Sequence, residues 1–299
     1  MITTLDQIVE RVKSKPIKRL AVAVAEDPHT IEAVGRAVKE KLVKAVVTGD
    51  EKAIKKVAVE NKVDPGSFEI IHEPDRAKAL TLAIGLVREG KADFLMKGLL
   101  DSSLYIRGII DKEKGLLPPG KLLSHVSVIQ VPAWKKLIIC GDVAVIPAPD
   151  LEAKVAILNY AIDIAHKLEI EKPKAVLLSA VEKVNPKMPS TTESAIIAKM
   201  ADRGQIKGAV VDGPLALDVA FSEESARIKG IVSPVAGDAD ILVFPSIEAG
   251  NIFFKASTYL AKGELGAVVV GATCPCVLTS RGDSEDTKFY SIALASLLS

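Results

Sequence analysis

The feature that most constrains the fold is an alternation, repeated along the whole chain, of short β-branched runs with amphipathic stretches. The run RLAVAVA at 19–25 precedes a stretch at 29–42 whose apolar residues recur at helical spacing, and KAVVTGD at 44–50 precedes another. Strands that are apolar throughout and separated by helices are typical of parallel strands buried on both faces. The alternation therefore predicts an α/β fold with mostly parallel sheets and right-handed crossovers.

The alternation is interrupted at 111–123 by DKEKGLLPPGKLL, which contains two glycines and two adjacent prolines. Such a cluster of glycine and proline residues favours a loop at which the chain crosses from one domain to the next. A chain of 299 residues is also long for a single hydrophobic core, so two domains are expected. Beyond the interruption, residues 125–145 contain two closely spaced strands, consistent with an antiparallel hairpin, before the alternation resumes.

Composition and charge argue against several classes of function. The net charge is +1 with acidic and basic residues mixed along the chain, so the electrostatic footprint of a nucleic-acid binder is missing. No apolar run reaches the roughly 18–20 residues of a membrane-spanning helix. The opening residues MITTLDQIVERVKSKP lack the apolar core and cleavage site of a signal peptide. The three cysteines also fit a reducing compartment, so a cytoplasmic location is expected.

Several familiar ligand motifs are missing. The first strand is not followed by G-x-G-x-x-G, and the chain contains neither G-x-x-x-x-G-K-[ST] nor G-x-S-x-G, so a dinucleotide fingerprint, a Walker site and a hydrolase serine are unsupported. Cys274 and Cys276 form a C-P-C rather than the C-x-x-C of redox and zinc pairs, and we expect them to be buried. With four histidines and no clustered pair, no metal site is expected.

Polar residues concentrate where five of the predicted strands end, which is where open α/β sheets bind ligands. The candidates are Lys97, Ser102, Ser103, Arg107, Asp142, Asp212, Asp218, Glu248, Asn251, Lys255 and residues 280–286. Most have a purely structural alternative: Asp212 begins a turn with Gly213 and Pro214, and Asn251 stands where a helix can start.

The last of these strand ends, LTSRGDSEDTK at 278–288, has the strongest case for a ligand. Asp283 or Ser284 can N-cap the closing helix, and Asp286 can compensate the positive dipole at its start. Capping does not explain Arg281, because an arginine just before a helix N-terminus adds positive charge where the dipole is already positive. A bound anion removes that cost, so Arg281 indicates a phosphate-like ligand.

These strand ends lie within longer blocks that together resemble the phosphate acyltransferases, the phosphotransacetylase and phosphate butyryltransferase family. The blocks are KVNPKMPSTTESA, VVDGPLALDVAFS, GDADILVFPSIEAGNIFFKASTYLA and LTSRGDSEDTKFYSIALA. With FLMKGLL and LLSHVSV the resemblance runs from about residue 90 to the C-terminus, and NPKMP, DGPLALD and EAGNI are closer to phosphate butyryltransferase. The resemblance implies the reversible reaction acyl-CoA + phosphate ⇌ acyl phosphate + CoA, with butanoyl-CoA favoured and acetyl-CoA as the alternative.

The resemblance also implies a two-domain α/β fold like that of isocitrate and isopropylmalate dehydrogenases, with the active site in the interdomain cleft. In that fold the C-terminal segment completes the first domain. The expected domains are therefore residues 1–120 together with 275–299, and residues 121–274. The family implies no cofactor besides the substrates CoA thioester and phosphate, no nucleic-acid or membrane partner, and a homodimer or higher homo-oligomer.

Carried over position by position, the catalytic Ser-Arg pair of the family falls on Ser280 and Arg281, and its second phosphate-binding arginine on Arg107. The catalytic aspartate of the family follows that pair by several residues. A strict count from Ser280 reaches a threonine, so Asp286, one position earlier, is the first choice and Asp283 the alternative. The implied substrate-binding residues are Arg107, Lys97, Asp212, Asp218, Glu248, Asn251 and Lys255.

In the mechanism that these roles support, a carboxylate takes the proton of the CoA thiol, Ser280 stabilises the oxyanion, and the arginines hold phosphate. A covalent acyl group on either cysteine is not required. Two rivals stay open. One is a metal-dependent decarboxylating dehydrogenase of the same fold, with Asp212, Asp218 and Asp240 as ligands. The other is a non-catalytic regulator that binds CoA or phosphate.

Overall fold

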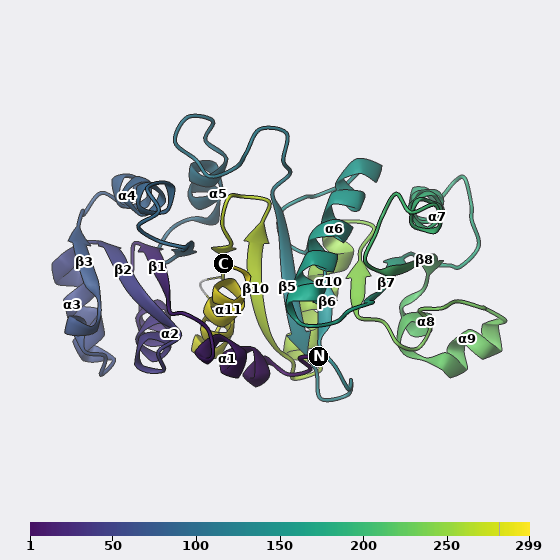
Figure 1. Ribbon diagram of the computed structural model, residues 1–299, viewed down its shortest axis with the longest axis horizontal. Helices are drawn as coiled ribbons and strands as arrows, with labels where there is room; N and C mark the ends of the chain where they lie inside the picture. Colours follow the sequence, from purple (N-terminus) through teal and green to yellow (C-terminus); the bar gives the residue numbers. More distant parts are fainter. Residues whose placement is uncertain (281) are drawn as a thin grey trace. The chain divides into compact units, whose positions relative to one another are not determined.

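The computed structural model describes residues 1–280 and 282–299 and divides into two compact units (Figure 1). Unit 1 comprises Met1–Thr4 and Ser124–Gly263, and unit 2 comprises Leu5–Leu123 and Glu264–Ser299. Strand β10 (Glu264–Val270) therefore belongs to unit 2, whereas the predicted boundary placed residues 264–274 in the other domain. The reason is local packing: the backbone N–H of Ala267 in β10 donates to the Ser291 hydroxyl of the C-terminal helix at 2.9 Å.

The sheet of unit 2 contains strands that are far apart in the sequence. Its strands are β1 (Lys18–Ala23), β2 (Val43–Gly49), β3 (Glu69–His72), β4 (Phe94–Lys97), β10 and β11 (Cys276–Val277). They run in the order β3-β2-β1-β4-β11-β10, and the pairs from β3 to β11 are parallel, whereas β10 pairs with β11 antiparallel. Four residues of β1 and all four of β4 are buried, as predicted for continuous apolar strands.

Helices cover both faces of this sheet. They are α1 (Leu5–Lys13), α2 (Pro28–Lys39), α3 (Glu51–Glu60), α4 (Arg76–Arg88), α5 (Ser102–Ile110) and α11 (Glu285–Leu298), with a short 3₁₀ turn, η1 (Pro65–Ser67). In Figure 1, α4 and α5 lie on one face, and α1, α2, α3 and α11 lie on the other. Asp27, Asp50 and Asp75 start α2, α3 and α4, because each carboxylate accepts hydrogen bonds from the first helical turn.

Unit 1 contains the other five strands, most of them paired in parallel. Its strands are β5 (Ser124–Gln130), β6 (Ile138–Cys140), β7 (Lys174–Leu178), β8 (Val210–Leu215) and β9 (Ile241–Val243), in the order β5-β6-β9-β7-β8. Only the β5–β6 pair is antiparallel among these, which confirms the hairpin predicted at 125–145. The helices are α6 (Leu151–Lys167), α7 (Pro189–Asp202), α8 (Leu217–Phe221), α9 (Glu223–Lys229) and α10 (Ile247–Tyr259). An ion pair between the buried Lys154 of α6 and Glu193 of α7 joins two of them.

The predicted fold class is confirmed at the level of a mixed α/β protein with mostly parallel strands and helices between them. Among residues 1–280 and 282–299, no helix combines the length and the apolar character needed to cross a membrane.

Candidate active site

The carboxyl ends of β1, β4 and β11 meet at one edge of the unit 2 sheet, because β4 pairs in parallel with both neighbours. Val277 is the register partner of Met96, so the residues that follow them, Leu278 and Lys97, stand level at this edge. Helices α2, α5 and α11 begin a few residues beyond it, and a helix start carries the positive end of the helix dipole. This is the part of an α/β sheet where anionic ligands bind.

Tight main-chain packing shapes the edge between β1 and β4. Val24, directly after β1, has a φ of 60°, a left-handed conformation that is rare for a β-branched residue. The backbone N–H groups of Gly98 and Leu99 donate to the carbonyl oxygens of Ala23 and Val24 at 2.9 and 2.7 Å. A Cβ atom on Gly98 would lie 2.1 Å from the Val24 oxygen, so only glycine fits there. Strained backbone of this kind clusters at functional sites.

The turn between β11 and α11 holds the predicted catalytic serine. Ser280 is exposed, and its backbone N–H donates to Asp283 Oδ2 at 2.7 Å. The Ser280 carbonyl in turn accepts from the Asp283 N–H at 3.2 Å. Ser284 is the N-cap, since its hydroxyl accepts from the Thr287 N–H at 3.2 Å. Ser284 therefore caps α11, as one of the two predicted alternatives, whereas Asp283 holds the main chain of Ser280. Arg281, the predicted phosphate ligand, lies outside the described residues.

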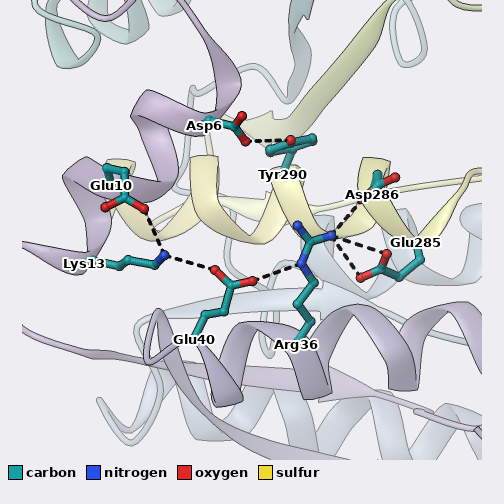
Figure 2. Close-up of polar contacts among 8 residues, drawn as sticks. All are labelled: Asp6, Glu10, Lys13, Arg36, Glu40, Glu285, Asp286 and Tyr290. Carbon is teal, nitrogen blue, oxygen red and sulfur yellow. Dashed lines mark hydrogen bonds and ion pairs between the residues drawn. The ribbon is translucent and has the colours of Figure 1, made fainter.

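Asp286, the first choice for the general base, pairs with an arginine that sequence reasoning missed. Its Oδ1 atom lies 2.7 Å from Nη1 of Arg36 on α2, and Glu285 Oε1 lies 3.4 Å from the same nitrogen (Figure 2). Arg36 also donates to Glu40 Oε1 at 3.1 Å, and its guanidinium lies 3.7 Å from the centroid of the Phe289 ring. Burial opposes the charge on Arg36, yet the hydrogen bonds to Asp286 and Glu40 outweigh burial and raise the pKa of the guanidinium above its ordinary value.

The contacts around Arg36 continue onto α1. Lys13 Nζ lies 3.1 Å from Glu40 Oε2 and 2.9 Å from Glu10 Oε1. Tyr290 of α11 donates its hydroxyl to Asp6 Oδ1 at 2.8 Å (Figure 2). Helices α1 and α2 are therefore both tied to the first turns of α11, the helix on which Asp286 stands.

Two buried lysines lie at the same sheet edge. Lys97, a predicted substrate-binding residue, is 3% exposed and donates to the carbonyl oxygens of Leu100 and Gly98 at 3.1 and 3.3 Å. Lys288, which sequence reasoning missed, is also 3% exposed and donates to Thr279 Oγ1 and the Ser280 carbonyl at 3.2 and 3.0 Å. Its signal in the sequence is a lone charge in the otherwise uncharged run TKFYSIALASLL. Burial lowers the pKa of Lys288, and the charges of Asp27 and Asp283 partly offset that effect.

Arg107 is exposed on α5, the helix that begins just beyond β4. Its Nε donates to the carbonyl oxygen of Ser103 at 3.2 Å, so the guanidinium folds back along its own helix. Its role as the second phosphate-binding arginine stays a prediction.

In unit 1 the predicted residues on α10 follow strand β9. The Asn251 amide donates to the carbonyl oxygen of Val143 at 3.2 Å and so joins α10 to the loop after β6. Asp142 in that loop is buried and accepts hydrogen bonds from Ser124 Oγ and from the Ala144 and Val145 N–H groups, which explains it as a structural anchor.

The remaining two predicted residues of α10 are differently placed. Glu248 is exposed in the first helical turn, where a hydrogen bond from Ser246 lowers the pKa of its carboxyl. The Lys255 ammonium lies 4.8 Å from the centroid of the Phe254 ring. The binding roles of Asn251, Glu248 and Lys255 stay predictions.

The three carboxylates of the dehydrogenase alternative have separate partners. Asp212 Oδ1 accepts from the Gly213 N–H at 2.8 Å, and Asp218 pairs with Lys229 at 2.9 Å. Asp240 stands just before β9, at the amino end of that strand, and pairs with Lys136 at 2.7 Å. Within the described part of the chain, no group of three or more His, Cys, Asp or Glu side chains is arranged to hold a metal ion. The structure therefore does not assemble the ligand set of that alternative.

The cysteines are buried, as predicted. Cys274 Sγ and Cys276 Sγ lie 4.0 Å apart, and the neighbouring Cys274 thiol together with burial raises the pKa of Cys276. Burial likewise raises the pKa of Cys140. Because the thiolate is the nucleophilic form, these environments disfavour an acyl-cysteine at Cys276 or Cys140.

Unit 2 also contains a cavity of about 460 Å³ away from the carboxyl ends of β1, β4 and β11. Its lining includes Asp93, which directly precedes β4, and so the cavity lies toward the amino end of that strand. Arg88, Leu116, Thr273 and Cys274 also line it. It does not coincide with the Ser280 turn.

The chain is similar to several known proteins over nearly its whole length. The chain matches the family model described as "Phosphate acetyl/butaryl transferase" over residues 3–83 and 68–296. It is 46% identical over 298 residues to phosphate butyryltransferase of Clostridium acetobutylicum, covering 100% of this chain and 99% of that protein. It is 44% identical over 293 residues to phosphate acetyltransferase of Thermotoga maritima, covering 98% and 99%. A crystal structure of a branched-chain phosphotransacylase from Enterococcus faecalis matches with a TM-score of 0.83 at 33% identity, covering 94% of this chain and 99% of that one.

Proposed function

This chain belongs to the phosphate acetyl/butaryl transferase family, and we propose that it moves a short-chain acyl group reversibly between CoA and inorganic phosphate. The resemblance found in the sequence is thereby confirmed, and the chain is an acyltransferase. The reaction is acyl-CoA + phosphate ⇌ acyl phosphate + CoA. It proceeds with both substrates bound together, so alignment of the reactants supplies much of the acceleration.

The observation that carries the proposal is the Ser280 turn at the carboxyl edge of β11. Ser280 is exposed there, and its main chain is fixed by Asp283 and Lys288 at the start of α11. An exposed hydroxyl on a fixed turn beside a helix start suits a developing oxyanion. Arg281 follows directly in the sequence, and a planar guanidinium suits bidentate binding of phosphate.

In the proposed mechanism a phosphate oxygen attacks the thioester carbonyl, and a C–O bond forms as the carbonyl oxygen becomes an oxyanion. Ser280 stabilises that charge by hydrogen bonding. The C–S bond then breaks, CoA leaves as the thiolate, and the proton that the carboxylate took from the attacking hydrogen phosphate passes to the sulfur. In the reverse direction the same carboxylate accepts the thiol proton, because the thiolate is the reactive form. Arg281 and Arg107 hold the phosphate throughout.

Two carboxylates compete for the role of the general base. Asp286 shares Arg36 with Glu285, so it acts as base only if that pairing leaves an oxygen for the thiol proton. Asp283 already accepts the Ser280 N–H through Oδ2. We retain Asp286 as the first choice on the family resemblance and Asp283 as the alternative.

We favour butanoyl-CoA over acetyl-CoA as the acyl donor. Overall identity does not separate the two, at 46% to the butyryltransferase and 44% to the acetyltransferase. The preference comes instead from the blocks NPKMP, DGPLALD and EAGNI, which are closer to the butyryltransferase type. The dehydrogenase-like details of the fold, a cytoplasmic location and a homo-oligomeric state stay predictions.

The deciding experiment is a substrate panel from acetyl-CoA to hexanoyl-CoA, with release of free thiol measured in the presence of phosphate. We expect phosphate-dependent release that is fastest with butanoyl-CoA. A reaction without phosphate is the control for simple hydrolysis. No release with any acyl-CoA would contradict the proposal and favour a non-catalytic binder. Loss of activity with EDTA, or a requirement for NAD(P), would favour the dehydrogenase.

A further inference from the structure

Lys288 is the one charged residue in the stretch of α11 that is buried continuously from Lys288 to Leu297. This helix lies beside β10 on one face of the unit 2 sheet (Figure 1). Burial of an ammonium group is costly unless polar partners replace the lost water. The chain nevertheless keeps a lysine here, where a leucine or methionine would fill the same space without that cost.

The partners of Lys288 explain what the buried charge does. Its Nζ donates to the Ser280 carbonyl oxygen at 3.0 Å and to Thr279 Oγ1 at 3.2 Å. Both acceptors are uncharged atoms of the turn between β11 and α11. The two hydrogen bonds therefore hold the turn in place and do not neutralise the charge of the lysine. The nearby carboxylates of Asp27 and Asp283 stabilise the ammonium form.

The turn is consequently held from two directions. Asp283 accepts the Ser280 N–H at 2.7 Å on one side of the residue, and Lys288 holds the carbonyl on the other. Thr279 is 3% exposed, whereas Ser280 is exposed to solvent. The lysine thus anchors the main chain from the interior while the serine hydroxyl stays accessible.

We propose that Lys288 is a positioning residue for acyl transfer, which fixes the main chain of Ser280 so that its hydroxyl stands where the oxyanion develops. This inference rests on the proposed function. It acts through Ser280 and not through contact with substrate. Small displacements of an oxyanion donor are expensive in rate, because the donor must be in place before charge develops.

The test is a double-mutant cycle between Lys288→Met and Ser280→Ala, with kcat and KM measured for the acyl-CoA substrate that is turned over fastest. We expect each single variant to lower kcat by about 10²-fold, the loss typical of a missing oxyanion donor. We expect KM for acyl-CoA to change less than about threefold, since ground-state binding is retained. The double variant should be no more than about threefold slower than Ser280→Ala, because Lys288 acts through that serine.

A matched control separates positioning from stability. Ser291 is a second buried polar residue of α11, and its hydroxyl donates to the Thr287 carbonyl at 2.7 Å, away from the Ser280 turn. We expect Ser291→Ala to lower the melting temperature but to keep wild-type kcat per folded molecule. Lys288→Gln, which retains a hydrogen-bond donor, should recover part of the kcat lost in Lys288→Met.

Two results would overturn the inference: wild-type kcat in Lys288→Met, or losses that multiply in the double variant. If Lys288→Met does not fold, Lys288→Gln and Thr279→Val take its place in the same cycle, and unchanged kcat in both would equally overturn it. A wild-type protein that releases no thiol with any acyl-CoA contradicts the proposed function itself. An active wild type with an unaffected Lys288 variant contradicts only the role of Lys288.

Discussion

Arg36 Nη1 lies 2.7 Å from Asp286 Oδ1, although 250 positions separate the two residues in the sequence. The same guanidinium binds Glu285 and Glu40 (Figure 2), and it also stacks over Phe289. The start of α11 is thus clamped by α2. Asp286 belongs to this clamp, whereas Asp283 belongs to the Ser280 turn. The two candidate bases therefore have different structural partners, and substituting each one can show which of them acts as the base.

The first prediction concerns the identity of the base. Asp286→Asn should lower kcat by at least about 10²-fold, because an amide cannot take the thiol proton. Asp283→Asn should cause a smaller loss, through displacement of Ser280. Steady-state kinetics in the direction from acyl phosphate to acyl-CoA checks both variants, because that direction requires deprotonation of the thiol. The opposite ranking of the two losses would assign the base to Asp283.

The second prediction concerns the phosphate ligand. Arg281→Ala should raise KM for phosphate by more than tenfold and lower kcat, while KM for acyl-CoA changes little, because only phosphate loses a bidentate partner. Arg281→Lys should recover part of the loss, since it restores charge but not the planar geometry. Initial-rate kinetics with each substrate varied in turn provides the measurement. Unchanged kcat and unchanged KM for phosphate would remove Arg281 from the anion site.

The third prediction concerns the clamp on α11. Arg36→Met should lower the free energy of unfolding by about 1 kcal/mol, because it removes partly exposed ion pairs and one cation–π contact. Lys13→Met, at the outer end of the same set of contacts, should cost less, about 0–1 kcal/mol. Urea denaturation at low and moderate salt measures both. Equal stability of Arg36→Met and wild type would show that the clamp contributes nothing.

The fourth prediction is a dependence of stability on pH in unit 1. Burial raises the pKa of Asp238, but hydrogen bonds from Lys136 and Lys174 outweigh it and lower the pKa to about 2 from an ordinary value of 3.8. A folded-state pKa below the unfolded one gives stability that is present above about pH 4 and is lost as the pH falls toward 2. Asp238→Asn should therefore destabilise the protein by roughly 1–2 kcal/mol at pH 6, and the difference should shrink as the pH approaches 3.

Denaturant unfolding of the wild type and Asp238→Asn at pH 6, 4.5 and 3 measures that difference. Asp202→Asn serves as the control, because its ion pair with Lys199 is exposed on both sides and should contribute little. A difference between wild type and Asp238→Asn that stays constant with pH would contradict the assignment.

The sequence by itself determined the class of fold and the family. Apolar runs and helical periodicity report the local state of the backbone, and they correctly indicated parallel strands, the β5–β6 hairpin and a capped helix after LTSRGDSEDTK. The sequence blocks between about residue 90 and the C-terminus correctly indicated the family, because each block is contiguous and needs no knowledge of tertiary structure.

Only the tertiary structure decided which partners the charged side chains have. Strand order brings α2 beside α11, and Arg36 therefore forms an ion pair with Asp286. The packing of α11 buries Lys288, which donates a hydrogen bond to the Ser280 carbonyl. Packing of β10 against α11 likewise moved the boundary of unit 2 to residue 264. Local sequence patterns set the state of the backbone, but the partner of a charge depends on which distant segment lies beside it, and that is fixed only when the sheet is assembled.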